Sequence, residues 1–159
     1  MAFLNKHISK KDHILDLGVF NPLSKIMVNE GYHVVNTQGE DLDEDQSTLI
    51  NQEYDVLTAF EIVEHLLNPY TVLKQNKAKK LIISVPLRLW FSTAYQSKTD
   101  MLDRHYHEFE PWQLDWLLEK TGYKIIASEQ WAHPVNKIGI RPILRRFTPR
   151  YYIVYAERI

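Results

Sequence analysis

The 159 residues are enough for one domain with a sizeable core and too few for two ordinary domains. Apolar residues make up 45% of the chain and charged residues 25%, a balance that excludes a disordered or fibrous protein. The formal net charge of -1 gives the whole molecule no electrostatic reason to bind nucleic acid, and the lack of cysteine excludes disulfides and thiolate metal sites.

The sequence also shows no targeting segment and no membrane-spanning segment. Residues 1–11 lack the apolar centre of a signal peptide, and no apolar run approaches the ~18 residues of a membrane span. We therefore expect a soluble, cytoplasmic protein without a membrane span.

Charge is uneven along the chain. Acidic residues gather at 40–45, and arginines gather near the other end at Arg141, Arg145, Arg146 and Arg150. Such runs are typical of solvated surface segments. The alternative is a basic rim that receives a phosphate-bearing or acidic substrate.

The first elements form a βαβ unit. Residues 13–17 are a short apolar run that predicts a strand, and residues 33–37 predict a second one. Between them, Asn21 and Pro22 signal the start of a helix, because asparagine can accept an orphan amide hydrogen and proline has none to leave unpaired. Gly31 is expected to end that helix. Strands joined in this way run parallel.

The alternation of strands and helices continues to the end of the chain. Two helices and four more strands are predicted: strands over 54–59, 80–85, 124–127 and 151–156, and helices over 67–76 and 111–121. Repeated βαβ units imply a mostly parallel sheet covered on both faces. We therefore expect one three-layer α/β domain over residues 1–159.

Ligands of such sheets lie beyond the carboxyl ends of the strands. The residues to consider are therefore 18–21, 37–40, 59–65 and the segment after Pro86. In the first of these, the turn after the first strand contains Gly18 alone, whereas a Rossmann fingerprint or a phosphate loop needs two or three glycines, so both are excluded.

The second candidate segment holds Glu61, Glu64 and His65, which share one face if the turn is helical. Zinc signatures of comparable spacing need a second histidine that this segment lacks, so no metal site is predicted. Two readings stay open. Either His65 bonds a loop carbonyl while the glutamates are solvated, or the three residues lie beside a ligand.

The third segment, residues 103–111, is a loop rich in aromatic and ionisable residues. Its His105 and His107 form a His-x-His pair, which is mostly incidental as a metal signal. A loop histidine whose pKa is near neutral can act as general base for an acceptor hydroxyl. A structural role and a catalytic role stay open for this loop.

Three stretches together resemble the class I S-adenosylmethionine (SAM) dependent methyltransferases of the small-molecule group. His-Ile-Leu-Asp-Leu-Gly (13–18) is similar to the strand and first glycine of the cofactor loop in that family. Residues 54–69, with Glu-His-Leu, resemble its fourth strand and the segment after it. Residues 105–123 resemble its later histidine-phenylalanine loop and the following helix. The likeness runs in order over about residues 12–131.

The resemblance implies a Rossmann-like sheet of seven strands whose last strand is antiparallel, and SAM as cofactor. It assigns Asp16, Gly18 and Asn21 to the methionine end of SAM, Thr37 and Gln38 to the ribose, and Ala59, Phe60 and Glu61 to positions across the cofactor. His65 and His105 are the candidate catalytic bases. Trp90, Phe91 and Tyr106 are candidates for the wall of the acceptor pocket, or for packing.

The sequence departs from the family at two places. Val19-Phe20-Asn21-Pro22 replaces the glycine-rich turn, and Gln38 stands where an acid usually binds the ribose hydroxyls. A neutral amide gives a weaker hydrogen bond than a carboxylate. The chain also begins close to the first strand, without the helices that often cover the site, which implies an open pocket or a partner that closes it.

The favoured hypothesis is a transferase that moves the methyl group of SAM to an oxygen or nitrogen of a small molecule or glycan precursor. The alternative is a non-catalytic methyltransferase-like module for binding or assembly, which the unusual cofactor loop favours. A nucleic-acid partner that uses the arginine cluster is disfavoured by the near-zero net charge. Monomer and homodimer both stay open.

Overall fold

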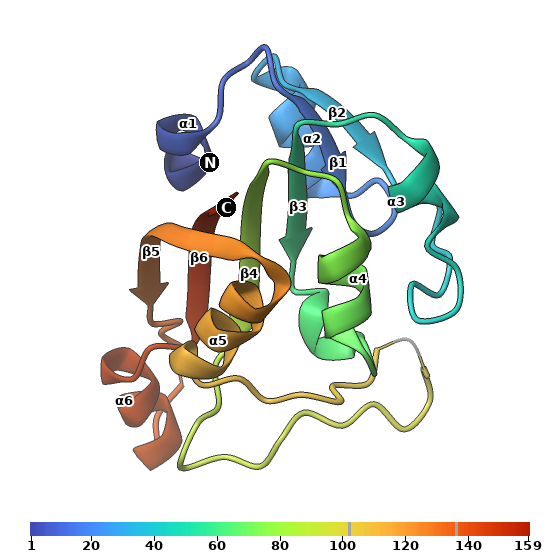
Figure 1. The fold of residues 1–159 in the computed structure, drawn as a ribbon. Coiled ribbons are helices and arrows are strands. Elements are labelled where there is room, and N and C mark those ends of the chain that lie inside the picture. Colours follow the sequence, from blue (N-terminus) through green and yellow to red (C-terminus); the bar gives the residue numbers. More distant parts are fainter. Residues whose placement is uncertain (102, 136) are drawn as a thin grey trace.

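Six strands form one sheet in the computed structural model, which describes residues 1–101, 103–135 and 137–159. The first four are parallel, and β6 runs antiparallel to its neighbours β4 and β5. The order across the sheet is β2-β1-β3-β4-β6-β5 (Figure 1). The strands are β1 (His13–Asp16), β2 (His33–Asn36), β3 (Val56–Phe60), β4 (Lys80–Pro86), β5 (Tyr123–Trp131) and β6 (Tyr151–Arg158). The predicted mostly parallel sheet with an antiparallel last strand is confirmed.

Helices lie on both faces of this sheet (Figure 1). They are α1 (Ala2–His7), α2 (Pro22–Asn29), α3 (Ser47–Asn51), the 3-10 turn η1 (Val63–His65), α4 (Pro69–Gln75), α5 (Pro111–Thr121) and α6 (Ile140–Phe147). Within the described ranges, no helix is both long enough and apolar enough to cross a membrane.

Two apolar layers hold the helices to the sheet. On one face, buried side chains of β3 and β4 such as Leu57 and Leu81 form a core with Leu114 and Leu118 of α5. On the other face, Met27 of α2 belongs to a second core with residues of α1 and of the strands. Each fully buried side chain of this size contributes roughly 1.5–3 kcal/mol, so the sheet is fixed from both sides.

Helix α2 begins where the sequence predicts. The Asn21 side-chain oxygen accepts hydrogen bonds from the backbone amides of Leu23 (2.8 Å) and Ser24 (3.1 Å). In return, the Ser24 hydroxyl accepts a bond from the Asn21 amide at 3.3 Å. Gly31 follows the helix with φ of 88°, a left-handed conformation that glycine adopts without strain. The Asn-Pro start and the glycine end are therefore confirmed.

Some expectations about the fold are wrong. The resemblance implies seven strands, whereas the described residues form six, and the segment between β2 and β3 contains the short helix α3 instead. The expectation that no helix precedes the first strand is also wrong. Helix α1 lies there, and its Phe3 and Leu4 are buried in the second core. Six residues are too few for a helical period to be recognised in a sequence.

Candidate functional site

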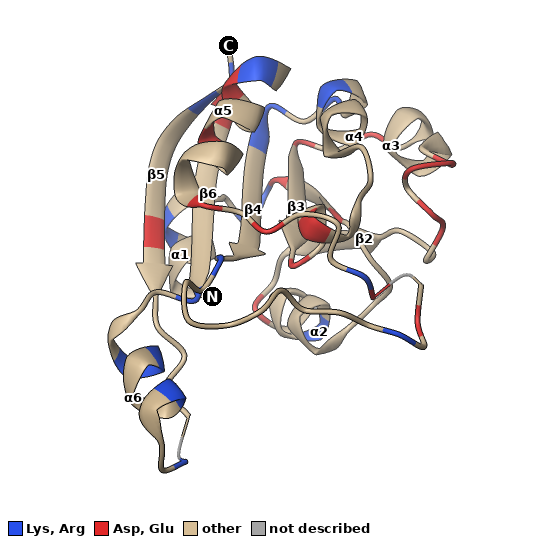
Figure 2. Cartoon of the chain, turned by 90° about the horizontal axis from the view of Figure 1, so that it is seen from below, with Lys and Arg blue, Asp and Glu red and all other residues tan. Residues whose placement is uncertain are grey.

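The candidate site lies along the edge where β1, β2, β3 and β4 all end. Because these strands are parallel, their carboxyl ends meet at the lower edge of the sheet in Figure 1. The long connection between β4 and α5 passes across this edge, and Figure 2 views the molecule from that side. The segments expected to face a ligand, 18–21, 37–40, 59–65 and the one after Pro86, therefore begin at this edge.

The turn after β1 is tied to the turn after β2. Gly18 has φ of 100°, and its backbone amide donates a 2.7 Å hydrogen bond to the Thr37 hydroxyl. The Thr37 amide donates in turn to the Asp16 carbonyl at 3.2 Å. A Cβ on Gly18 would lie 3.3 Å from the Ile62 side chain, so the turn also packs against the segment after β3.

Asp16 supports this turn from within the protein. Its buried carboxylate accepts hydrogen bonds from Thr58 (2.7 Å), Ser24 (2.9 Å) and Asn36 (3.0 Å). Burial raises the pKa of Asp16, and the three hydrogen bonds oppose that rise. The polar atoms of Asp16 are thus engaged inside the fold, and those of Asn21 are engaged in the helix cap. Their contact with the methionine end of a cofactor stays a prediction.

Bulky side chains flank the same turn. Val19 and Phe20 are more than half exposed, and Val19 Cγ1 lies 3.0 Å from where a Cβ on Gly39 would stand. Val19 therefore reaches across from the first turn to the second. Gln38 is exposed at the end of β2, and its side-chain amide donates to the Asn36 carbonyl at 3.3 Å. It is open to a ligand, as its predicted role requires.

A pocket of about 330 Å³ opens at the end of β3, and Gly18, Thr37 and Gln38 are not among its lining residues. Such a volume lies within the usual range for small-molecule sites. The pocket contains Phe60 and Glu61, whereas Ala59 points into the core and is fully buried. The other lining residues come from α1, α2 and strands β4 to β6: Met1, Phe3, Leu4, Leu23, Ser84, Trp131, Tyr151 and Ile153.

Glu61 supplies the carboxyl group of this pocket and has a strained backbone. Its φ is 55°, which makes it the one non-glycine residue with positive φ in the described chain. The Ser84 hydroxyl donates to its carboxyl oxygen at 2.9 Å, and its own amide donates to the Ser84 carbonyl at 3.0 Å. Burial raises the pKa of Glu61. Strain of this kind concentrates at functional sites.

Three ionisable side chains meet directly beyond Glu61. Glu64, His65 and His105 each offer one ligand atom, and these atoms all lie within 4.8 Å of one another. His65 Nε2 is 3.8 Å from Glu64 Oε1, and the two imidazole rings meet edge to face with centroids 4.6 Å apart. The structure thus brings together the two candidate bases, 40 positions apart in the sequence, and adds Glu64.

Glu64 is fully buried, and neither of its carboxyl oxygens has a hydrogen-bond partner. Burial raises its pKa to about 8, and the nearby charge of Glu61 acts in the same direction. In the structural reading of this segment, the expectation of solvated glutamates is wrong for Glu64, which is fully buried, whereas the expected contact of His65 with a loop carbonyl is present. Burial and then the neighbouring His65 lower the pKa of His105.

Backbone hydrogen bonds hold the histidine loop against η1. The Glu64 carbonyl accepts from the amides of Tyr106 (2.8 Å) and His107 (3.2 Å). His65 Nδ1 lies 3.1 Å from the Arg104 carbonyl, which cannot donate, so this nitrogen carries the proton. The lone pair of His65 is then on Nε2, the atom nearest Glu64.

A basic hollow of about 570 Å³ lies next to this cluster. It is lined by Lys98, Arg145 and Arg150, together with Leu89, Tyr95 and their neighbours in the β4–α5 connection. Arg145 belongs to α6, which projects from the body of the molecule (Figure 2), and it is the arginine of that helix that lines the hollow. Two of the four arginines of the sequence cluster, Arg145 and Arg150, thus line one hollow, and its role as a rim for an acidic substrate stays a prediction.

The aromatic residues proposed for the acceptor wall are only partly suited to it. Tyr106 lines a hollow of about 400 Å³ with Tyr95, Arg104 and His105. Trp90 is 74% exposed, and its ring packs on Phe91. Neither of these two lines a pocket described here, so their role stays a prediction.

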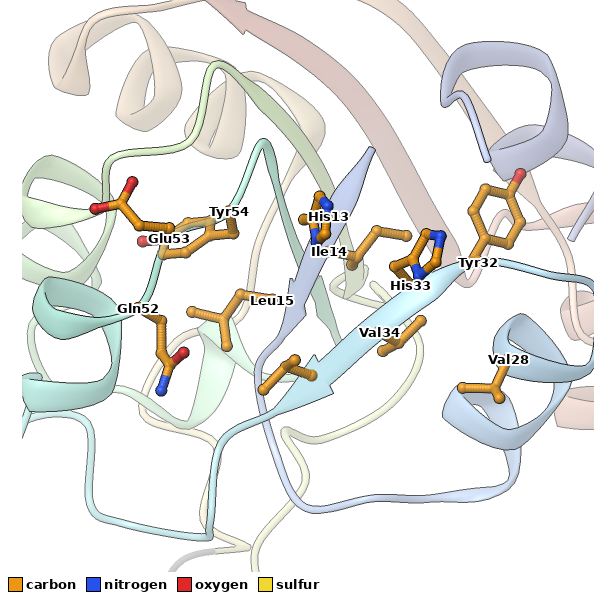
Figure 3. A pocket seen from close by; sticks show the side chains of 11 residues that line it. His13, Ile14, Leu15, Val28, Tyr32, His33, Val34, Gln52, Glu53 and Tyr54 are labelled. Atoms are coloured by element: carbon orange, nitrogen blue, oxygen red, sulfur yellow. The ribbon is translucent and has the colours of Figure 1, made fainter. Parts of the chain in front are cut away.

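Another pocket, of about 370 Å³, lies away from this edge. Figure 3 shows its lining residues on β1, on β2 and on the segment before β3, among them the stacked rings of His13 and His33. β2 is an outer strand of the sheet. This pocket contains no residue of the turns after β1, β2 and β3, so it is separate from the candidate site.

Three features of the site are missing from the sequence prediction. Glu64 was seen in its motif but not assigned a role, although the Glu-x-x-Glu-His spacing marks it. Ser84, the partner of Glu61, carries no sequence signal. The contribution of Met1 and Phe3 to the pocket also carries no sequence signal, because it depends on how α1 packs.

No family model and no curated protein matches the sequence. The fold, however, is similar to those of several solved structures. A SAM-dependent methyltransferase from Mesorhizobium loti is 14% identical with a TM-score of 0.67, over 99% of this chain and 96% of that one. One from Methanosarcina mazei is 10% identical with a TM-score of 0.69, over 100% and 98%. The 1,6-didemethyltoxoflavin-N1-methyltransferase of Burkholderia thailandensis, with 1,6-didemethyltoxoflavin and S-adenosylhomocysteine bound, is 16% identical with a TM-score of 0.59, over 99% and 75%.

Proposed function

Because the chain has the fold of SAM-dependent methyltransferases, we propose that it transfers the methyl group of SAM to an oxygen or nitrogen of a small molecule or glycan precursor. One observation carries the proposal. The 330 Å³ pocket is lined by Phe60 and Glu61 at the carboxyl end of β3. The Glu64–His65–His105 cluster follows directly, and the charge of Glu61 acts on Glu64. A cofactor in that pocket has an acceptor region with proton-accepting groups beside it.

The residues around the pocket fit the chemical parts of SAM. The apolar walls suit a nucleoside base, and the Glu61 carboxyl is an acceptor for a cationic group. Gln38 does not line this pocket, but it is exposed at the end of β2 and can bond the ribose hydroxyls of a cofactor that extends to that turn, which Thr37 holds in place. SAM supplies a methyl group that is already activated as a sulfonium, so the protein has only to align donor and acceptor and to remove a proton where the acceptor is a hydroxyl.

The two histidines suit that proton transfer. The lowered pKa of His105 keeps its imidazole neutral at pH 7, the form that accepts a proton. His65 donates its Nδ1 hydrogen to the Arg104 carbonyl, which leaves Nε2 free as a base. Both side chains are partly accessible beside the hollow that Tyr95 and Tyr106 line.

The basic hollow favours an acceptor with an acidic or phosphate group. Lys98, Arg145 and Arg150 lie close enough to line one cavity, and guanidinium groups bind such oxyanions in bidentate fashion. Arg145→Ala should raise the KM for such an acceptor and leave the affinity for SAM unchanged.

Titration calorimetry of the purified chain with SAM and S-adenosylhomocysteine tests the cofactor assignment. Binding to one site is expected, and Phe60→Ala and Gln38→Ala should each weaken it. Gln52→Ala is the matched control for Gln38→Ala, because Gln52 is an exposed glutamine in the separate pocket of Figure 3. Equal affinities in all three variants would mean that the cofactor is held elsewhere.

The second candidate function is a non-catalytic module for binding or assembly. Its support is the turn after β1, where the Gly18 amide and the Asp16 carboxylate are both satisfied by internal hydrogen bonds. In that case neither SAM nor S-adenosylhomocysteine should bind at millimolar concentration. Binding of either compound rejects this alternative.

A further inference from the structure

We propose that Glu64, His65 and His105 form a binding site for one divalent transition-metal ion, which holds the acceptor oxygen of the substrate. The ion-binding part stands on the geometry of the three side chains alone. The part that concerns the acceptor rests on the proposed methyl transfer. The proposal departs from the sequence-based expectation that the segment binds no metal.

The spacing of the three ligand atoms is close to that of an occupied site. All lie within 4.8 Å of one another, and His65 Nε2 is 3.8 Å from Glu64 Oε1. Metal bonds of about 2.0–2.2 Å in a tetrahedral arrangement place ligand atoms roughly 3.4 Å apart. Side-chain rotations that move each ligand atom by about 1 Å are therefore enough to bring all three atoms within bonding distance of one ion.

The carboxyl group of Glu64 is the independent observation that points to a ligand. It is fully buried, and both of its oxygens lack a hydrogen-bond partner. A buried carboxyl without partners is costly, and buried charges in proteins are normally paired or bound to metal. A cation between Glu64 and the two imidazoles would give these oxygens a partner, which no described protein group provides.

Arg150 and Glu61 are the charged groups that also face Glu64. The Arg150 charge acts on Glu64 over a distance, while its side chain donates to the Leu87 carbonyl at 3.3 Å. Glu61 is bonded to Ser84 and adds negative charge. Arg150 therefore does not occupy the position between Glu64 and His65, and Glu61 increases the attraction for a cation.

The hydrogen bonds behind the cluster are those that metal-binding histidines use. The ring hydrogen of His65 Nδ1 goes to the Arg104 carbonyl, which fixes the tautomer and points the Nε2 lone pair at Glu64. Such a bond from the second ring nitrogen is the usual way of orienting a ligating histidine. The two amide bonds to the Glu64 carbonyl keep the loop that carries His105 in place.

The ligand set indicates which ions fit. Two imidazoles and one carboxylate suit Zn²⁺, Mn²⁺, Co²⁺ or Fe²⁺, whereas Mg²⁺ and Ca²⁺ prefer ligands that are all oxygen. Three protein ligands leave coordination positions open, as catalytic sites require. His105 lines the 400 Å³ hollow with Tyr95 and Tyr106, so the open side faces a space that a substrate can enter.

An ion at this position would lower the pKa of an acceptor hydroxyl bound to it. With the ion bound, His65 and His105 are ligands rather than free bases, so that hydroxyl releases its proton to solvent. Its oxygen then forms the new bond to the methyl carbon. The bond between sulfur and the methyl carbon breaks, and its electron pair stays on sulfur as S-adenosylhomocysteine leaves. No oxidant or reductant is needed, and the acceptor class is a hydroxyl compound, preferably one with a second oxygen that chelates the ion.

Titration of the chelator-treated full chain with Co²⁺, Zn²⁺ and Mn²⁺ tests the site. One ion per chain is expected, with visible Co²⁺ absorption bands typical of nitrogen and oxygen ligands. Glu64→Gln and His105→Asn should each weaken binding at least about 100-fold. His33→Asn is the matched control, because His33 stacks on His13 in the separate pocket and reports any ion bound there.

Four results overturn the inference: no binding of the three ions up to about 1 mM, unchanged affinity in both cluster variants, loss of binding in His33→Asn, or methyl transfer to hydroxyl acceptors that survives chelation undiminished. Circular dichroism checks that the variants fold. If Glu64→Gln fails this check, His105→Asn decides, since His105 is only partly buried. If ions bind as expected while SAM does not, the metal site stands and the proposed methyl transfer fails.

Discussion

Replacing Glu64 by glutamine should stabilise the metal-free protein at neutral pH. The folded state raises the pKa of Glu64 from 4.5 to about 8, through burial and then the charge of Glu61. At pH 7 folding must therefore protonate a group that is ionised in the unfolded chain. From the two pKa values, this costs about 3 kcal/mol at pH 7 and about 1 kcal/mol at pH 5. Glutamine keeps the shape and carries no such cost.

The difference between the two proteins should therefore depend on pH in a defined direction. The stability of the wild type relative to Glu64→Gln is fully present below pH 4.5 and is lost progressively as the pH rises from 4.5 to about 8. At pH 7 the variant should melt roughly 6–12 °C higher, given about 2–4 °C per kcal/mol for a domain of this size. Glu61 and Arg150 are present in both proteins, so their titration largely cancels in the comparison.

Thermal melts of both proteins between pH 4.5 and pH 8 in the presence of a chelator provide the measurement. Addition of Zn²⁺ or Mn²⁺ should then stabilise the wild type and leave Glu64→Gln nearly unchanged, because only the wild type has the carboxylate ligand. A variant that is equally or less stable across the whole pH range would refute the reasoning, since it would mean that the Glu64 carboxyl is hydrated or paired.

Three further predictions concern the turns and the histidines. Gly18→Ala should lower the free energy of unfolding by about 1–2 kcal/mol in a denaturant titration, because its φ of 100° disfavours a side chain and the new Cβ meets Ile62 at 3.3 Å. Gln38→Asp should tighten SAM binding about fivefold in calorimetry, since a charged acceptor bonds the ribose more strongly; weaker or equal binding would place the ribose elsewhere. His65→Ala and His105→Ala should each reduce turnover at least about 100-fold while the SAM affinity stays nearly constant; parallel loss of SAM binding would mark them as structural.

The parts of the fold that local chemistry dictates could be predicted from the sequence. The start of α2 follows from the capping asparagine and the proline, and its end follows from Gly31. Apolar runs located the strands to within a few residues, and parallel pairing then fixed the edge at which the site lies. No tertiary information is needed for these steps.

Features that depend on packing between distant segments could not be predicted. The burial of Glu64 arises because the β4–α5 connection folds back and its amides bond the Glu64 carbonyl, about 40 positions away. The same fold-back brings His105 to His65. The segment Glu-Ile-Val-Glu-His contains only one histidine, so its sequence alone does not predict a metal site. The second histidine, His105, comes from the β4–α5 connection. Helix α1 was missed for a related reason, since it is defined by its contacts with the sheet rather than by its six residues.

The distribution of unfavourable features bears on where the chemistry takes place. Around the turn after β1, the strained conformation belongs to a glycine and the buried carboxylate has three donors, so that region is at low energy without a ligand. Around η1, a glutamate has a left-handed backbone and a fully buried carboxyl has no partner. Natural proteins keep such costs chiefly where function requires them. Apart from the buried Nε2 of His7 in α1, the uncompensated features named here for the described residues thus lie around η1, and it is there that an ion or substrate gains most from binding.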